Sequence, residues 1–330
     1  ILPANIFLRH KDLYDQRNYF RTITRFNSLS AWRLTSIEPV PRKDLDTADF
    51  IIRLTPARKY SFVANLEGSR NNNTVSGNLF GIAVNVGLQN RNFARAANLS
   101  STNIRFGVET GRDTATDIKF IQTRQLSINH TFLFPRSIPR MNWLPEKIRN
   151  SFRTVLAFNA SLIERRQLYN LNTINGSWGY EFVWGKKSIT LRFPNIEYSS
   201  FNSLPLLDSI FVKNPSLENI FANGFISSMM GGLQVKGGRN KHINTFNFNV
   251  EVSGLLSGLI KKNDFLDTNL FRFIKVDAEF ARKISFKKSS LVLHGFVGLG
   301  YEFNSTANKD NRYNLPLLRQ YFAGGPNSMR

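Results

Sequence analysis

Strict two-residue alternation of apolar residues runs through most of this chain from Tyr60 onward. In residues 80–89, every second residue from Phe80 to Leu88 is large and apolar, and the residues between them are Gly, Ala, Asn or Gln. Successive side chains of a strand point to opposite faces, so this pattern predicts strands with one apolar face and one polar or small face. Eleven segments follow it, near residues 58–70, 77–90, 99–112, 116–133, 151–165, 171–184, 188–199, 223–237, 242–255, 270–284 and 289–303. Most are longer than the roughly 5–6 residues of an ordinary globular strand and suit the about 9–11 residues that a tilted strand needs to cross a bilayer.

The composition of the second face indicates what surrounds these strands. It is rich in Gly, Ser and Asn with interspersed charges, whereas the solvent face of a soluble sandwich usually carries Lys, Glu and Thr. Small and charged residues suit a hydrated lumen, and Phe, Leu and Val suit lipid. The pattern favours a membrane β-barrel, with a soluble multi-stranded β-protein as the alternative. It predicts outward positions for Phe80, Phe246, Phe248 and Leu299, and inward positions for Asn85, Asn249, Glu251 and Glu302.

Composition excludes several other classes of protein. The 330 residues include 44 Lys and Arg, 23 Asp and Glu and no cysteine, which removes disulfide scaffolds, cysteine zinc sites and thiol catalysis. The cations are spread without a dense run, so we expect no nucleic-acid partner despite the net charge of +21. The four histidines lie in separate segments without a catalytic or metal-binding context: His10, His130, His242 and His294. We therefore expect no enzyme activity, catalytic residue, metal or cofactor.

Residues 1–57 follow a different pattern, and a domain boundary is predicted near Pro56. A helix is expected from Asp12 to about Phe26, followed by short strands at 32–40 and 48–55 joined by a turn of Pro, Arg, Lys and Asp. A helix followed by a hairpin makes a small soluble α+β unit. No run approaches the roughly 20 apolar residues of a membrane-spanning helix. The chain opens without a signal peptide, so we expect a mature form or an internal fragment.

Two stretches of sequence suggest a family. The chain ends in QYFAGGPNSMR (320–330), and GIAVNVGLQNRNFARAANL occupies residues 81–99. Both resemble the BamA/TamA superfamily of outer-membrane assembly factors, also called the bacterial surface antigen family. The family's aromatic-x-Gly-Gly-x-x-Ser-x-Arg loop is matched by Phe322, Gly324, Gly325, Ser328 and Arg330, and its turn after the second barrel strand by Asn90, Arg91, Asn92 and Phe93. The Pro-Asn-Met variant of the loop is most similar to the TamL branch of Bacteroidetes-type bacteria.

The resemblance implies an all-β fold, an antiparallel transmembrane β-barrel of sixteen strands. This chain would hold the first eleven, in residues 58–330, and would end in the sixth extracellular loop. Residues 1–57 would be the C-terminal part of the last POTRA domain in the periplasm, and the barrel would lie in the bacterial outer membrane. The last five strands would lie outside this sequence.

The function that the resemblance implies is non-catalytic insertion or assembly of β-barrel and surface proteins through a laterally opening seam. The seam strand would present Tyr60, Phe62, Ala64, Leu66 and Gly68, although turn chemistry before Asn71 is the better explanation of Gly68 itself. Expected partners are nascent outer-membrane clients, a TamB-like periplasm-spanning protein or other assembly subunits, lipid and lipopolysaccharide. A two-partner-secretion-type pore or a passive porin remains the alternative, and the N-terminal unit and the loop favour an assembly or secretion factor over a porin.

Arg330 is expected to hold the loop inside the lumen. A guanidinium presents five donors in a planar fork and pairs best with carboxylates. The partners implied by the family lie on strands twelve and thirteen, beyond this sequence. Inward carboxylates would substitute only in part: Glu251, Asp277, Glu279 and Glu302.

Overall fold

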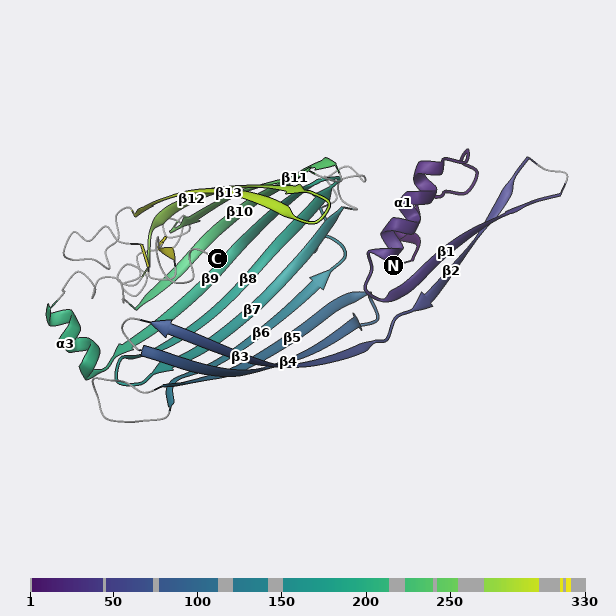
Figure 1. Cartoon of the computed structure of the whole chain (residues 1–330). Coiled ribbons are helices and arrows are strands. Elements are labelled where there is room, and N and C mark those ends of the chain that lie inside the picture. Colours follow the sequence, from purple (N-terminus) through teal and green to yellow (C-terminus); the bar gives the residue numbers. More distant parts are fainter. Residues whose placement is uncertain are drawn as a thin grey trace, which may run out of the picture.

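The computed structural model of the protein describes residues 2–43, 46–73, 77–111, 121–141, 151–213, 223–239, 242–254, 270–302, 315–316 and 319–321. Within them, eleven long strands form one antiparallel sheet in which each strand pairs with the next along the chain (Figure 1). The strands are β3 (Tyr60–Asn73), β4 (Gly77–Phe93), β5 (Asn98–Gly111), β6 (Ile121–Phe134), β7 (Phe152–Arg165), β8 (Tyr169–Trp184), β9 (Lys187–Ser203), β10 (Gly224–Arg239), β11 (His242–Ser253), β12 (Phe273–Ser285) and β13 (Ser290–Glu302). The prediction of eleven consecutive antiparallel strands is confirmed, with some ends shifted by a few residues.

The sheet is curved but open within the described residues. Its edges are β3 and β13, which are not paired with each other. Residues 315–316 and 319–321 lie against one face, which we call the inner face, and the opposite face is the outer face. Figure 1 shows the curvature of the sheet. The eleven strands therefore form a curved wall, and closure of that wall into a barrel stays a prediction.

The two faces differ as the alternation predicts. Side chains predicted to face outward are exposed: Phe80 is 54%, Phe246 38%, Phe248 36% and Leu299 73% exposed. Glu251 and Glu302 on the inner face are only 5% and 4% exposed. Inner-face polar side chains also bond one another, since Asn85 donates to Glu67 and Asn249 donates to Asp277. An apolar face of this extent on the outside of a sheet is expected where lipid, not water, surrounds it.

A β-bulge in β9 reverses the alternation within that strand. Phe193 and Pro194 together lie opposite the single residue Trp178 of β8, and the register with β10 shifts at the same place. Proline lacks the amide hydrogen for a ladder bond and is therefore found at bulges. Ile189 faces outward before the bulge, whereas Glu197, at a position of the same parity, faces inward after it. The bulge thus puts a carboxylate on the inner face.

The N-terminal residues form a separate small unit. It comprises a short 3-10 helix η1 (Pro3–Asn5), α1 (Gln16–Asn27) and a two-stranded antiparallel sheet of β1 (Trp32–Pro41) and β2 (Ala48–Pro56). The hairpin was predicted correctly, but the helix begins at Gln16 and not at Asp12. The reason is the cap: the Asp15 carboxylate accepts a hydrogen bond from the Arg17 amide at 2.8 Å, and Asp15 itself is extended.

This unit packs against one end of the sheet, which we call the near end. Phe26, Leu29 and Ala31 are buried together with Ala97 from the β4–β5 turn. Arg25 donates hydrogen bonds to the Asn5 side chain and to the Pro135 carbonyl. Burial, and then the neighbouring cations, lower the pKa of Arg25 to about 10, so it stays charged at neutral pH. These contacts fix the unit against the β4–β5 and β6–β7 connections.

The opposite, far end carries the β9–β10 connection. Helix α3 (Pro205–Lys213) follows β9 there, as Figure 1 shows. Among the described residues, no helix combines the length and the apolar character needed to cross a bilayer.

Lysine on the two faces of β13 should have different consequences. Val297 lies mid-strand on the outer face and is 60% exposed, so Val297→Lys puts a charge into lipid and should lower the free energy of unfolding by about 2–4 kcal/mol. His294→Lys is the matched control, because the inner-face His294 lies 2.7 Å from Glu279 and a lysine there places its ammonium group near that carboxylate. Denaturant unfolding of the full-length protein in lipid vesicles measures both costs. Equal costs would contradict lipid contact with the outer face.

Candidate functional site

The seam residues proposed from the sequence share the outer face of an edge strand. Tyr60, Phe62 and Leu66 of β3 are 58%, 68% and 77% exposed. Within the described part of the chain, β3 is hydrogen-bonded to β4 alone. A Cβ added at Gly68 would meet nothing within 4 Å, so packing does not require glycine there. An edge strand of this kind presents unpaired backbone groups to which another strand can bond.

The Asn90–Phe93 motif organises the tight β4–β5 turn at the near end. The Asn90 side chain accepts from the Asn92 amide at 3.1 Å, and the Asn92 side chain accepts from the Ala97 amide at 3.0 Å. Ala94, Arg95 and Ala97 all have positive φ, between 51° and 54°, a conformation that needs such local support in residues other than glycine. The Arg91 carbonyl accepts from Ser30 Oγ at 3.3 Å. The motif therefore shapes the turn that contacts the N-terminal unit.

The signature loop was predicted from Phe322, Gly324, Gly325, Ser328 and Arg330, and these residues lie outside the described part of the chain. The inward orientation of Arg330 and its carboxylate partners stay predictions. The residues immediately before the loop are described, however, and they lie on the inner face. They include Arg319, which contacts the wall.

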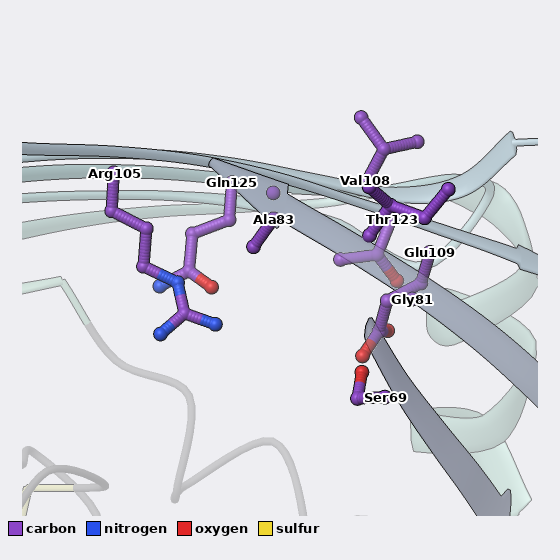
Figure 2. A pocket seen from close by; sticks show the side chains of 10 residues that line it. Ser69, Gly81, Ala83, Arg105, Val108, Glu109, Thr123 and Gln125 are labelled. Atoms are coloured by element: carbon purple, nitrogen blue, oxygen red, sulfur yellow. The ribbon is translucent and has the colours of Figure 1, made fainter. Parts of the chain in front are cut away.

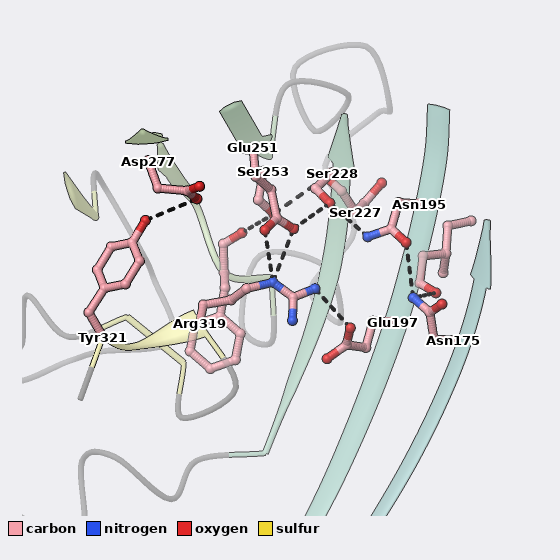
Figure 3. Close-up of polar contacts among 12 residues, drawn as sticks. Asn175, Asn195, Glu197, Ser227, Ser228, Glu251, Ser253, Asp277, Arg319 and Tyr321 are labelled. Atoms are coloured by element: carbon pink, nitrogen blue, oxygen red, sulfur yellow. Dashed lines mark hydrogen bonds and ion pairs between the residues drawn. The ribbon is translucent and has the colours of Figure 1, made fainter. Parts of the chain in front are cut away.

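Arg319 is held by two buried carboxylates from different strands. Its Nε donates to both oxygens of Glu251, at 3.1 and 2.9 Å, and its Nη2 donates to Glu197 Oε2 at 2.9 Å (Figure 3). The three side chains are 14%, 6% and 8% exposed. Burial opposes protonation, but the two carboxylates outweigh it and raise the pKa of Arg319 above its ordinary value. An arginine and two carboxylates that are shielded from water form strong charge-assisted hydrogen bonds. These bonds anchor the segment that carries Arg319 to the wall.

A chain of neutral polar groups continues from the anchor across the wall. Ser228 Oγ donates to Glu251 at 2.8 Å, Asn195 donates to Ser228 at 2.9 Å, and Asn175 donates to Asn195 at 3.0 Å. Figure 3 shows these side chains in a row across β8, β9, β10 and β11. Each member of this row donates a hydrogen bond to the next, so buried acceptors are satisfied and each side chain fixes the orientation of its neighbour. We call this row, with Arg319 and Glu197, the inner-face network.

Two glycines of β13 let the segment approach the wall closely. A Cβ on Gly298 would lie 2.6 Å from the Tyr321 ring, and a Cβ on Gly300 would lie 2.2 Å from Leu315. The Tyr321 hydroxyl also lies 3.3 Å from the Asp277 carboxylate, to which it donates. Burial, followed by the nearby carboxylates, raises the pKa of Tyr321 to about 12. The wall and the segment are therefore complementary in shape as well as in charge.

A small hollow lies on the inner face beside the β3 edge. Figure 2 shows Arg105 and Gln125 on one side of the sheet and Val108 on the other. Arg105 lies 3.3 Å from Glu67, but both side chains are about half exposed, which makes the pair weak. The hollow has a volume of about 70 Å³ and holds at most a few water molecules. Among the described side chains, no group of three or more His, Asp or Glu is placed to hold a metal ion.

Sequence reasoning missed Arg319 and Glu197. Glu251 was correctly placed on the inner face, but simple alternation from Ile189 onward places Glu197 outside, and only the bulge brings it in. Pro194 within a strand was the available signal for that bulge. Arg319 carried no signal of its own, because its partner Glu197 lies 122 residues away.

Comparison with known proteins supports the fold. No family model and no curated protein matches the sequence. BamA from Haemophilus ducreyi lacking POTRA domains 1–3 has a similar structure, with a TM-score of 0.64 and 12% identity over 100% of this chain and 56% of that one. CdiB from Acinetobacter baumannii (TM-score 0.55, 10% identity, 92% of this chain and 49% of that one) and CdiB from Escherichia coli (0.53, 12%, 93% and 52%) are also similar. The chain spans about half the length of these proteins, and identities this low establish a likeness of fold alone.

Removing Arg319 should release the segment from the wall. Arg319→Ala leaves Glu197 and Glu251 buried without their cation, which should cost about 3–5 kcal/mol in the free energy of unfolding. Arg319→Lys should cost less, because it keeps the charge but loses the planar fork. Unfolding in lipid vesicles gives the energies, and hydrogen–deuterium exchange of residues 315–321 reports the release.

The control for this experiment is Arg124→Ala. Arg124 lies 3.9 Å from Glu164 with both side chains more than half exposed, so its removal should cost no more than about 1 kcal/mol. Similar costs for the two alanine variants, with unchanged exchange at 315–321, would show that the network does not hold the segment.

Proposed function

We propose that this protein is an outer-membrane β-barrel protein that assembles other β-barrel or surface proteins through the edge of β3. The observation that carries the proposal is an edge strand with an exposed apolar outer face, in a wall whose fold resembles BamA and CdiB. The loop and turn motifs that resemble the BamA/TamA superfamily support the same function. No catalytic step is needed.

The physical basis is strand addition in lipid. A bilayer offers no partner for backbone amides and carbonyls, so an unpaired strand cannot enter it without a large cost. A client strand that bonds to β3 satisfies those groups while its apolar side chains join the outer face formed by residues such as Phe62 and Leu66. The assembly factor then acts as a template and is released unchanged when the client closes on itself.

The remaining parts take supporting roles in this proposal. Residues 1–57 are assigned as the C-terminal part of a periplasmic POTRA domain, and their contact with the near end would pass clients to the wall. The barrel domain is assigned to residues 58–330. The narrower assignment to the TamL branch, and with it a TamB-like partner, rests on residues 320–330 alone.

A translocation pore is the second candidate, because CdiB from two organisms shares the fold. A pore would use the inner face, where Arg105, Glu67 and Asn85 keep a polar surface beside the β3 edge. The segment anchored by Arg319 lies against that same face. The two candidates therefore predict different contact sites for a passing protein.

Cysteine cross-linking separates the two candidates, since the chain has no cysteine of its own. Ala64→Cys places a thiol on β3, and Ala160→Cys places the same change on the same face of β7, which is paired on both sides. Ser127→Cys places a thiol on the inner face. During assembly of a β-barrel client with a cysteine in its terminal strand, the full-length protein should cross-link strongly at position 64 and not at position 160.

Cross-linking at the inner-face position 127 tests whether the protein acts as a pore. Cross-links at position 127 without any at 64 would contradict assembly at the edge and would support translocation through the lumen. Equal cross-linking at 64 and 160 would show that β3 has no special role.

A further inference from the structure

Positive charge is concentrated at the near end of the sheet. Six segments form this end: residues 56–62, 90–100, 131–141 with 151–155, 182–190, 235–239 with 242–245, and 281–291. Each has at least two Lys or Arg, and none of their described residues is Asp or Glu, although Glu181 borders this end opposite Arg153 and Thr190. The far end is different, because Glu109, Glu164 and Asp208 lie there among the cations. The net charge of the chain is thus unevenly placed between the two ends.

Each of the six segments presents an exposed cation. One from each is Lys59, Arg95, Arg140, Lys187, Arg239 and Lys288, and we call this set the cationic rim. None of the six forms an ion pair with a carboxylate in the described part of the chain. An arc of unneutralised cations is costly through mutual repulsion, which an external anion relieves.

The rim borders the apolar outer face, and aromatic side chains mark the boundary. Trp184 is 72% exposed and pairs across β8 and β9 with Lys187. Tyr60 is 58% exposed and lies under the Lys59 ammonium at 5.1 Å. Phe286, 60% exposed, precedes Lys287 and Lys288 in the β12–β13 turn. Exposed aromatic rings beside Lys or Arg are typical of the level where acyl chains meet lipid headgroups.

We propose that the cationic rim binds the anionic phosphate headgroups of the phospholipid leaflet around the near end. The proposal rests on the membrane placement given under Proposed function. A membrane surface fits the geometry better than an acidic protein, because the cations are distributed over all six segments of the near end instead of forming one patch. A leaflet reaches all six segments at once, and it adjoins the apolar face without a gap.

The test measures the lipid selectivity of the full-length protein in phosphatidylcholine bilayers. Small amounts of spin-labelled phosphatidylglycerol or phosphatidylcholine report how strongly each lipid associates with the protein surface. The wild type should prefer phosphatidylglycerol, and high salt should weaken the preference. Lys187→Gln with Lys288→Gln should reduce it by up to about fivefold for each charge removed.

The matched control is Arg70→Gln with Lys213→Gln, which removes two exposed cations from the far end. Both double variants are first checked for heat-modifiable folding, and the wild-type salt dependence provides a readout that needs no variant. No preference in the wild type, or an equal loss in the control, would overturn the proposal even if client assembly continues. Loss of client assembly with the preference intact would count against the proposed function alone.

Discussion

Backbone hydrogen bonding in an apolar medium is the constraint on which this structure depends. Lipid cannot replace a missing amide or carbonyl partner, so a membrane sheet must pair each strand with its neighbours. Consecutive antiparallel pairing does this for β4 to β12. The apolar outer face and the polar inner face then follow from alternation. Within the described residues, the edges of β3 and β13 are where this requirement leaves backbone groups unpaired, and the proposed function places the client at β3.

The inner-face network shows how charge is handled on the other side of the wall. Glu197 and Glu251 are nearly inaccessible, so their charges are tolerable only while Arg319 bonds both of them and the Ser228 hydroxyl bonds Glu251. Buried ion pairs add little net stability compared with apolar packing, but they penalise every arrangement that separates them. The network therefore fixes where the segment before the signature loop meets the wall.

The sequence predicts the strands well because alternation reports a single physical choice, lipid or lumen, at every position. It predicts the start of α1 less well, since the cap at Asp15 competes with an equally plausible acidic residue at Asp12. The inward position of Glu197 depends on one extra residue near Pro194, which reverses alternation without changing composition. Arg319 could not be assigned because its partners come from strands far away along the chain. Tertiary pairing, unlike periodicity, leaves no local trace.

The most direct test of the account is hydrogen–deuterium exchange of the β3 amides while the full-length protein assembles a β-barrel client. If a client strand adds to the edge, the amides of residues 60–68 should become protected during assembly, whereas those of the doubly paired β7 should not change. Protection should be lost again when the client is released. Client insertion without any change in exchange at 60–68 would contradict strand addition at β3.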